Sequence, residues 1–280
     1  MTNNPADLND DRSLTINEVT AYGAAWRRGE TWPVGPNPIP IEYVTQAGYL
    51  WRSGEAYCCD FAFSPPLFWV PCDVIVIPPP EESDGAGGDD APEKTAVGGV
   101  ATTRTFSLRQ YAPGEPVTVA VRAQLGADML VYAVEDAPPD GWAVGQIGSG
   151  GAFDAINDKV KWGPFFDNQP RELTYVAIAP PGESGARTFL GTLSFDGSNL
   201  LISDGRLCSL HTVDANSDGI VGLADFQELV AATHGPGSPS GDYCMDYDGD
   251  GDTDLVDFAE FQRRFTGALQ QGLETRKPEE

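Results

Sequence analysis

The segment DYDGDGDTDLVD, residues 246–257, carries oxygen-bearing side chains at the spacing of a calcium-binding loop. Gly251 stands at loop position 6, where the backbone turns sharply and a β-carbon would clash. Six aspartates within twelve residues repel one another at neutral pH, so we expect the segment to fold around a hard divalent cation. The predicted Ca²⁺ ligands stand at loop positions 1, 3, 5, 7, 9 and 12, with position 7 acting through its backbone carbonyl: Asp246, Asp248, Asp250, Asp252, Asp254 and Asp257.

A second segment, DANSDGIVGLAD at residues 214–225, repeats this spacing. Gly219 occupies the turn position, and Gly222 at position 9 leaves a vertex that a water molecule would fill. The predicted Ca²⁺ ligands of this loop are Asp214, Asn216, Asp218, the carbonyl of Ile220, and Asp225.

A third segment with this spacing, DLNDDRSLTINE at residues 7–18, lies near the N-terminus. Its turn position holds Arg12 instead of glycine, and a positive φ at such a residue costs on the order of 1 kcal/mol. We therefore expect a weaker or more distorted Ca²⁺ site here. Its predicted ligands are Asp7, Asn9, Asp11, the carbonyl of Ser13, Thr15 and Glu18.

Helical periodicity follows each of the three loops. Apolar residues recur at i, i+3 and i+7 spacing, which predicts one apolar stripe per helix. Loop position 8, expected to form a short β-bridge to a partner loop, holds Leu14, Val221 and Thr253. The stripes comprise Val19, Tyr22 and Trp26 after the first loop, Leu223, Phe226, Leu229 and Val230 after the second, and Leu255, Phe258, Phe261 and Phe265 after the third.

The two C-terminal units each consist of a loop and an exiting helix, because no helical pattern precedes either loop. Their first ligands, Asp214 and Asp246, lie 32 positions apart. Residues 208–267 resemble a type I dockerin, and the resemblance implies antiparallel packing around two calcium ions and binding to a cohesin-type β-sandwich. Residues 5–56 resemble a degenerate dockerin with one calcium loop, because PVGPNPIP offers no carboxylates before a second predicted helix at 41–54.

Residues 97–207 carry eight segments of strand-like composition separated by turn signals, with no helical pattern between them. This pattern predicts a two-sheet sandwich of immunoglobulin-like or cohesin-like type. The sequences PPDGW, GGAFD and VKW also resemble bacterial surface immunoglobulin-like repeats, which implies a structural or adhesive module. The expected strands lie within residues 103–111, 116–125, 129–138, 142–148, 159–165, 171–180, 188–197 and 199–205.

The segment FAFSPPLFWVPCDVIVIPPP, residues 61–80, is dense in aromatic residues, β-branched residues and proline. We expect it either to pack back on the N-terminal helices or to dock on another molecule as an extended arm. Residues 79–95 are rich in proline, glycine and acidic residues, which predicts a flexible, solvated linker.

Together these patterns predict a multidomain α + all-β protein: an immunoglobulin/cohesin-like β-sandwich flanked by small α-helical EF-hand/dockerin-like modules. The expected segments are an N-terminal module with one calcium loop at 1–60, the arm and linker at 61–96, the sandwich at 97–207, a module with two calcium loops at 208–269, and a charged tail at 270–280.

The 280-residue chain is strongly acidic, with a formal net charge of −25 and a sequence pI of about 4.1. This charge argues against nucleic acid and against anionic membrane surfaces as partners. No apolar run reaches transmembrane length, and MTNNPADLND has no secretory-leader pattern. Loops of this kind are saturated at extracellular Ca²⁺ levels, so we expect an extracellular or cell-surface protein whose leader is absent from this sequence.

Five cysteines fit an oxidising compartment. A bond between Cys208 and Cys244 would tie together the segments that lead into the two loops of the C-terminal module, and Cys72 is expected to pair with Cys58 or Cys59. One thiol would then remain, either reduced or joined to another chain.

No catalytic signature stands out: GxSxG, HExxH and a phosphate-binding loop are all missing from the sequence. Trp142 and Trp162 fit core packing better than a sugar platform. We expect a non-enzymatic protein that self-associates head-to-tail into a filament or surface lattice. The alternatives are a dockerin-tethered accessory component that binds a cohesin-like protein or polysaccharide, and a fragment of a larger secreted enzyme.

Overall fold

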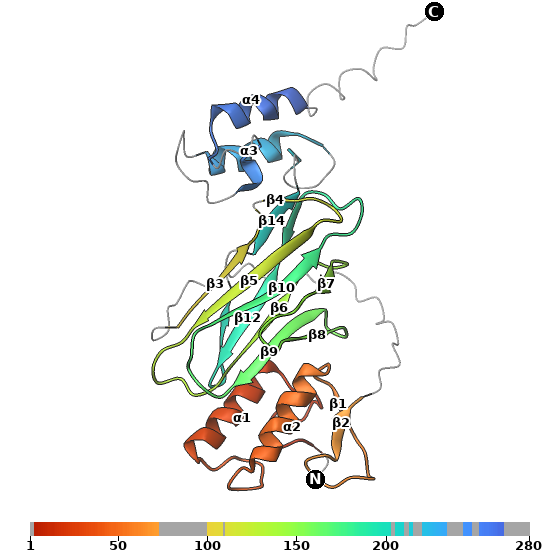
Figure 1. Cartoon of the computed structure of the whole chain (residues 1–280), viewed down its shortest axis with the longest axis vertical. Coiled ribbons are helices and arrows are strands. Elements are labelled where there is room, and N and C mark those ends of the chain that lie inside the picture. Colours follow the sequence, from red (N-terminus) through yellow and green to blue (C-terminus); the bar gives the residue numbers. More distant parts are fainter. Residues whose placement is uncertain are drawn as a thin grey trace, which may run out of the picture.

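The computed structural model describes residues 3–72, 100–108, 110–202, 205–209, 213–214, 220–233, 243–247 and 252–265. A β-sandwich forms the middle of the molecule (Figure 1). One helical unit, α1 and α2, lies against one end of the sandwich, and a second unit, α3 and α4, lies at the opposite end. The three parts therefore follow one another along the long axis of the molecule.

Two antiparallel sheets form the sandwich, and a small third sheet extends it toward the C-terminal unit. The four-stranded sheet runs in the order β3 (Ala101–Phe106), β5 (Pro116–Gln124), β10 (Arg171–Ile178) and β7 (Ala143–Gly145). The five-stranded sheet runs β13 (Ser198–Leu201), β12 (Leu190–Phe195), β6 (Tyr132–Ala137), β9 (Lys159–Phe165) and β8 (Ala152–Asp154). The small sheet runs β11 (Ala186–Thr188), β14 (Arg206–Ser209) and β4 (Gln110–Tyr111).

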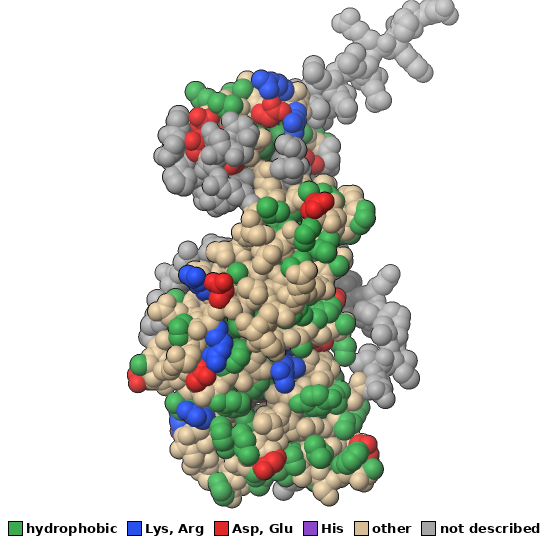
Figure 2. Space-filling model, in the orientation of Figure 1, with side chains coloured by type: hydrophobic (Ala, Val, Ile, Leu, Met, Phe, Trp, Pro, Cys, Tyr) green, Lys and Arg blue, Asp and Glu red, His purple; other side chains and the backbone are tan. Residues whose placement is uncertain are grey.

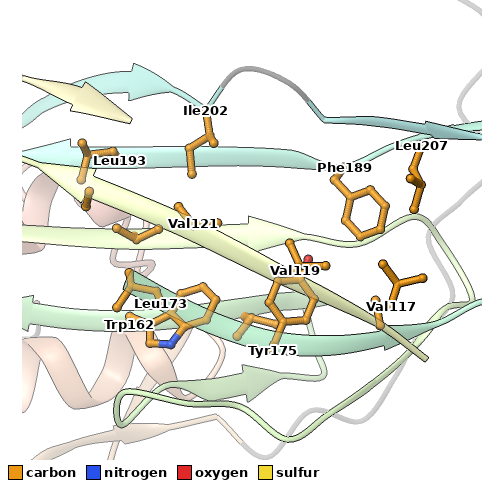
Figure 3. Close-up of a cluster of buried hydrophobic side chains, with 14 of the residues drawn as sticks. Val117, Val119, Val121, Trp162, Leu173, Tyr175, Phe189, Leu193, Ile202 and Leu207 are labelled. Carbon is orange, nitrogen blue, oxygen red and sulfur yellow. The ribbon is translucent and has the colours of Figure 1, made fainter. Parts of the chain in front are cut away.

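The core between the sheets follows from the two-residue period of the strands. Val117, Val119 and Val121 of β5 are fully buried, whereas Thr118 and Arg122, which point to the other face, are exposed, as the alternating pattern predicts. Figure 3 shows the valines meeting aromatic and aliphatic side chains of the other strands, with Trp162 and Tyr175 among them. The tryptophans expected to pack in the core do so, because Trp142 is 5 % exposed and Trp162 is 0 % exposed.

A charged group is also buried between the two sheets. The guanidinium of Arg104 pairs with the Asp136 carboxylate, and its Nη1 donates to the Phe189 carbonyl over 3.0 Å. The Tyr175 hydroxyl donates to the same carboxylate over 2.9 Å. Because both charges are fully buried and hydrogen-bonded, loss of either partner would leave the other uncompensated, which fixes how the sheets face each other.

The N-terminal unit contains α1 (Ile16–Arg28), α2 (Ile41–Arg52) and a hairpin of β1 (Tyr57–Cys59) and β2 (Trp69–Pro71). Cys58 and Cys72 form a disulfide, which resolves the pairing that the sequence left open. Phe68 and Trp69 of the hairpin pack into the same core as the helices. This part of the aromatic segment packs back on the helices, whereas Phe61, Phe63 and Leu67 are exposed. Residues 73–80 of the expected arm lie outside the described residues.

The C-terminal unit contains α3 (Leu223–Ala232), a short 3₁₀ turn (Tyr243–Met245) and α4 (Leu255–Arg264). The expected disulfide between Cys208 and Cys244 is present and joins β14 to this unit. The unit has its own small core, which includes Val213, Leu229, Ala232, Met245, Tyr247 and Phe261.

Each of the eight expected strand segments contains a strand, and β8, β11 and β14 add three short strands that the patterns did not predict. The β-sandwich with flanking helices is thus confirmed. In the part of the chain that the structure describes, no helix has the length and apolarity needed to cross a membrane.

Candidate metal centres

All three predicted loops lead into a helix at the same loop position. Helix α1 begins at Ile16, α3 at Leu223 and α4 at Leu255, and each of these residues is position 10 of its loop. The preceding residue, position 9, is the helix N-cap in each case, in extended conformation. The three segments therefore share one local backbone frame, although they differ in ligand residues.

The acidic residue at position 12 makes the same contact in each loop. It accepts a hydrogen bond from the backbone N–H of position 9, over 3.0 Å from Thr15 to Glu18, 2.7 Å from Gly222 to Asp225 and 2.8 Å from Asp254 to Asp257. In two loops it also accepts from the N–H of position 2, over 3.3 Å from Leu8 and 2.6 Å from Tyr247. The first helical turn thus holds the position 12 carboxylate over the loop.

The two carboxylate oxygens of Asp7, position 1 of the N-terminal loop, have different environments. Its Oδ2 accepts from the Arg12 N–H over 3.0 Å and from the Tyr57 hydroxyl over 2.5 Å. Its Oδ1 is buried and has no hydrogen-bond partner. Burial and the hydrogen bond to Asp7 raise the pKa of Tyr57, which keeps this hydroxyl a donor. A buried, unpartnered carboxylate oxygen calls for a cation, so Asp7 fits a Ca²⁺ ligand.

Side chains at loop positions 3 and 5 hydrogen-bond to the backbone of the same loop. Asn9 Oδ1 accepts from the Asp11 N–H over 3.3 Å, and Asp11 Oδ1 accepts from the Ser13 N–H over 2.8 Å. Arg12 has a φ of +64°, the left-handed conformation that the sequence predicts for the turn position. Asp10, at position 4, is also left-handed, with a φ of +61°.

The predicted β-bridge of the N-terminal loop has an unexpected partner. The bridge is formed by Ser13, one position before the predicted Leu14, and it joins Ala56, which follows α2, rather than a second loop before α2. The Leu14 N–H donates to the Glu55 carbonyl and the Tyr57 N–H donates to the Arg12 carbonyl, each over 3.0 Å. The proline-rich segment before α2 therefore does not take the place of a partner loop in this bridge.

The last loop brings three carboxylates together. Oxygen atoms of Asp252, Asp254 and Asp257 lie within 4.8 Å of one another. The sequence assigns only the carbonyl of Asp252 to the ion, whereas the structure brings its side chain into the cluster as well. Asp246 is 2 % exposed, and its carbonyl accepts from Gln110 Nε2 of β4 over 3.2 Å. Asp248 and Asp250 lie outside the described residues.

The middle loop is described only at its ends. Asp214 is half-buried and Asp225 is fully buried, whereas the Ile220 side chain is 53 % exposed, as suits a residue that would act through its carbonyl. Asn216 and Asp218 lie outside the described residues. Across the three loops, the predicted ligands are carboxylate, amide, carbonyl and hydroxyl oxygens, and Ca²⁺ prefers oxygen ligands. The hydroxyl is that of Thr15, which donates to Glu18 Oε2 over 2.7 Å.

The apolar stripes of the C-terminal helices are only partly covered. Phe261 and Leu229 are buried, but Leu223 is 71 % exposed, Leu255 is 78 % exposed and Val230 is 56 % exposed. The predicted helical period is present, yet the first apolar residue of each stripe faces solvent. Val256 beside Leu255 is also 54 % exposed.

The N-terminal helices, in contrast, pack on the five-stranded sheet. Helix α1 contacts β12, β6, β9 and β13, and α2 contacts β9 and β8. The Thr20 and Ser194 hydroxyl oxygens lie 2.8 Å apart in a buried hydrogen bond across this interface. A β-carbon on Gly48 of α2 would lie 2.9 Å from Pro164 of β9, so glycine permits the close approach of this helix.

A buried lysine anchors this interface. The Lys161 ammonium of β9 is fully buried and donates to Glu55 Oε1 over 2.6 Å, to Asp154 Oδ2 over 2.7 Å and to the Trp51 carbonyl over 2.9 Å. Burial alone would raise the pKa of Asp154, but hydrogen bonds from Asn157 and Lys161 outweigh it and hold the pKa below its usual value. Sequence reasoning missed this group. One sequence feature could have indicated it: Lys161 alternates with the inward-facing Val160 and Trp162 and so lies on the outer face of the sheet. An element that covers this face must provide hydrogen-bond acceptors for the lysine.

No family model matches the chain, and no curated protein matches it. Among solved structures, it is similar to the human F-spondin reeler domain, at 15 % identity over 40 % of this chain and 91 % of that chain, with a TM-score of 0.31. It is also similar to the second type II cohesin module of the ScaA scaffoldin of Acetivibrio cellulolyticus (10 % identity, 40 % and 97 % coverage, TM-score 0.27). A third similar structure is ChBD2 from Thermococcus kodakarensis KOD1 (17 % identity, 36 % and 92 % coverage, TM-score 0.25). Similarity at this level assigns the chain to no family.

Proposed function

We propose that this chain is a calcium-stabilised, non-catalytic extracellular protein that uses its C-terminal helix pair to dock on a partner. The observation that carries the proposal is the exposure of Leu223 and Leu255, 71 % and 78 %, at the first helical residue of each C-terminal loop. Exposed apolar residues at equivalent places on a paired structure are typical of a binding surface. The two disulfides are in keeping with an oxidising, extracellular setting.

Calcium would order this surface. The carboxylates of Asp252, Asp254 and Asp257 converge just where α4 begins, and three like charges at that spacing repel one another without a counter-ion. Ca²⁺ bound there would neutralise the carboxylates and fix the start of α4, which carries Leu255 and Val256. The docking surface would therefore form only with the metal bound.

The partner we favour is a separate cohesin-like β-sandwich protein. Self-association would need a free sheet surface on a second copy. The N-terminal helices already cover one end of the five-stranded sheet, through contacts such as Thr20 with Ser194. This covered part of the sheet is therefore not available to helices α3 and α4 of another copy.

Head-to-tail self-association is the second candidate, and one observation favours it. The outer face of the four-stranded sheet carries exposed Thr103, Thr105 and Thr118 and an exposed ion pair between Arg122 and Glu172. Charged side chains are sparse on the visible side of the sandwich between the two helical units (Figure 2). In a chain with a net charge of −25, a nearly neutral face would accept an acidic, apolar-tipped helix pair with little repulsion.

The test combines a binding and a sedimentation experiment on the full chain in calcium and in chelator. Titration against purified cohesin-type modules, with a double variant Leu223→Asp and Leu255→Asp, tests docking on a separate protein, and Leu201→Asp on β13, 60 % exposed, is the matched control. We expect calcium-dependent binding that the double variant abolishes and the control retains. Calcium-dependent multimers lost in the double variant would favour self-association. A monomer that binds no cohesin-type module would contradict both.

A further inference from the structure

The segment Glu55–Tyr57 lies between the N-terminal loop and the sandwich and is bonded to both. On the loop side, its backbone pairs with Arg12 and Leu14, and the Tyr57 hydroxyl donates to Asp7 over 2.5 Å. On the sandwich side, Glu55 Oε1 accepts from the Lys161 ammonium over 2.6 Å. Glu55 therefore contacts both sides, the loop through its carbonyl and the sandwich through its carboxylate, and the next residue, Ala56, forms the bridge to Ser13.

Lys161 makes this segment important for docking. Its ammonium is fully buried, and its three N–H groups meet three acceptors, of which Glu55 and the Trp51 carbonyl come from the N-terminal unit. While the unit is docked, the ammonium is buried, and displacement of Glu55 alone would leave it with Asp154 and the Trp51 carbonyl. Because an under-compensated buried charge is strongly unfavourable, loss of Glu55 from this position would favour undocking, which exposes Lys161 to water.

The loop side depends on a cation. Asp7 Oδ1 is buried without a partner, while Oδ2 holds Tyr57 and Arg12. A bound cation would compensate Oδ1 and also Asp11 and Glu18, the other carboxylates of the predicted site. Without the cation, rotation of the Asp7 carboxylate toward water would lower its free energy, because the unpartnered oxygen would be hydrated. This rotation would break the hydrogen bonds from Tyr57 and Arg12 to Asp7.

We infer that Ca²⁺ in the N-terminal loop locks the N-terminal unit onto the sandwich by holding Glu55 against Lys161. This inference rests on the proposed function, because it requires the N-terminal loop to bind the metal. Calcium would then have two roles in one chain. It would order the docking surface of the C-terminal unit and stabilise the interface between the N-terminal unit and the sandwich. Loss of calcium would expose the part of the five-stranded sheet that α1 covers, including Ser194.

Accessibility of position 194 reports docking directly. Ser194 is fully buried and bonded to Thr20 of α1, so a cysteine there is protected while the unit is docked. The experiment measures the labelling rate of Ser194→Cys by a thiol reagent, in a Cys59→Ser background, by peptide mass spectrometry. We expect chelation to raise the rate about tenfold or more, as for any local opening that loses about 1.4 kcal/mol of protection.

Matched variants separate this site from the others. Asp7→Asn and Asp246→Asn change position 1 of the N-terminal and the last loop, and only Asp7→Asn should raise labelling in the presence of calcium. Asn9→Ala removes an exposed ligand without touching the buried Tyr57 contact, and the same increase is expected. Equal labelling with and without calcium would overturn the inference.

Calcium stoichiometry, measured on the same samples by isothermal titration calorimetry, distinguishes failure of the N-terminal calcium site from failure of its locking role. If Asp7→Asn loses one bound ion while labelling stays unchanged, the metal site stands and the locking role is wrong. If Asp7→Asn loses no ion, the N-terminal calcium site itself is wrong. If labelling rises in step with loss of that ion, both stand.

Discussion

The two helical units start from the same loop design and present their first helical residue to opposite environments. Ile16 and Leu255 both stand at loop position 10, yet Ile16 is 5 % exposed and Leu255 is 78 % exposed. The N-terminal residue packs into a core that also contains aromatic residues of the hairpin and Ala133 of the sandwich. The C-terminal residue has no such cover in the described part of the chain.

The cause lies in what surrounds each unit rather than in the loop. The N-terminal unit gains a hairpin, a disulfide within the unit and a buried ionic anchor on the sandwich. The C-terminal unit is joined to the sandwich by the Cys208–Cys244 disulfide, the Gln110 contact to Asp246, and an exposed pair of Arg206 and Glu228. One motif can therefore serve as an internal brace when covered and as a binding surface when left open.

The largest effect is expected at the N-terminal anchor. Lys161→Met removes the ammonium and leaves the buried Asp154 without its ion-pair partner, while Glu55 keeps the longer 3.8 Å contact to Lys159, so we expect a loss of about 3–5 kcal/mol in the free energy of unfolding. The matched change Arg263→Met on α4, where the side chain is 74 % exposed, should cost less than about 1 kcal/mol. Urea unfolding at neutral pH measures both. Equal effects would show that the N-terminal interface carries no special anchor.

The two disulfides provide a second comparison of the N-terminal and C-terminal units. Cys208 and Cys244 are 36 positions apart and Cys58 and Cys72 are 14 apart, so chain entropy predicts losses of about 4 and about 3 kcal/mol when each pair is changed to serine. Hydrogen exchange should place the first loss in α3 and α4 and the second in the hairpin. Spread of either effect over the whole sandwich would contradict this division into units.

Loop position 10 offers a matched pair of substitutions. Ile16→Ala removes buried methyl groups and should cost about 2–4 kcal/mol, whereas Leu255→Ala on an exposed surface should change stability by less than about 0.5 kcal/mol. Thermal unfolding monitored by circular dichroism tests the pair. A large loss for Leu255→Ala would mean that this residue supports the fold and is not part of a docking surface.

Acid should weaken the N-terminal interface. The pKa of Asp154 is held below its usual value, so its stabilising contribution is complete above the unfolded-state pKa of about 4 and is lost as the pH falls through the folded-state value. Labelling of Ser194→Cys, relative to the unfolded chain at the same pH, should therefore rise as the pH falls below about 4, and an Asp154→Asn variant should flatten this rise. No change with pH, or the same change in the variant, would assign the acid sensitivity to other groups.

Local features of the site could be predicted from the sequence, because they depend on spacing alone. The helix starts at Ile16, Leu223 and Leu255 and the left-handed Arg12 follow directly from the loop pattern. The alternation along β5 likewise placed the core valines correctly. Short strands such as β8 and β11 were missed because three residues carry too little periodicity to register.

Features that depend on docking could not be predicted. Lys161 and Glu55 are 106 positions apart, and nothing near either residue indicates the other. The apolar period predicted a helix after each C-terminal loop, where the structure has α3 and α4, but the period does not tell which apolar residues a neighbour will cover. The exposure of the stripe residues Leu223, Val230 and Leu255 therefore could not be predicted.

Calcium stoichiometry of the intact, chelator-stripped chain is the decisive measurement. We expect three bound ions per chain by calorimetry, with one lost in each of Asp7→Asn, Asp214→Asn and Asp246→Asn. A chain that binds no calcium and unfolds at the same urea concentration with and without chelator would contradict it.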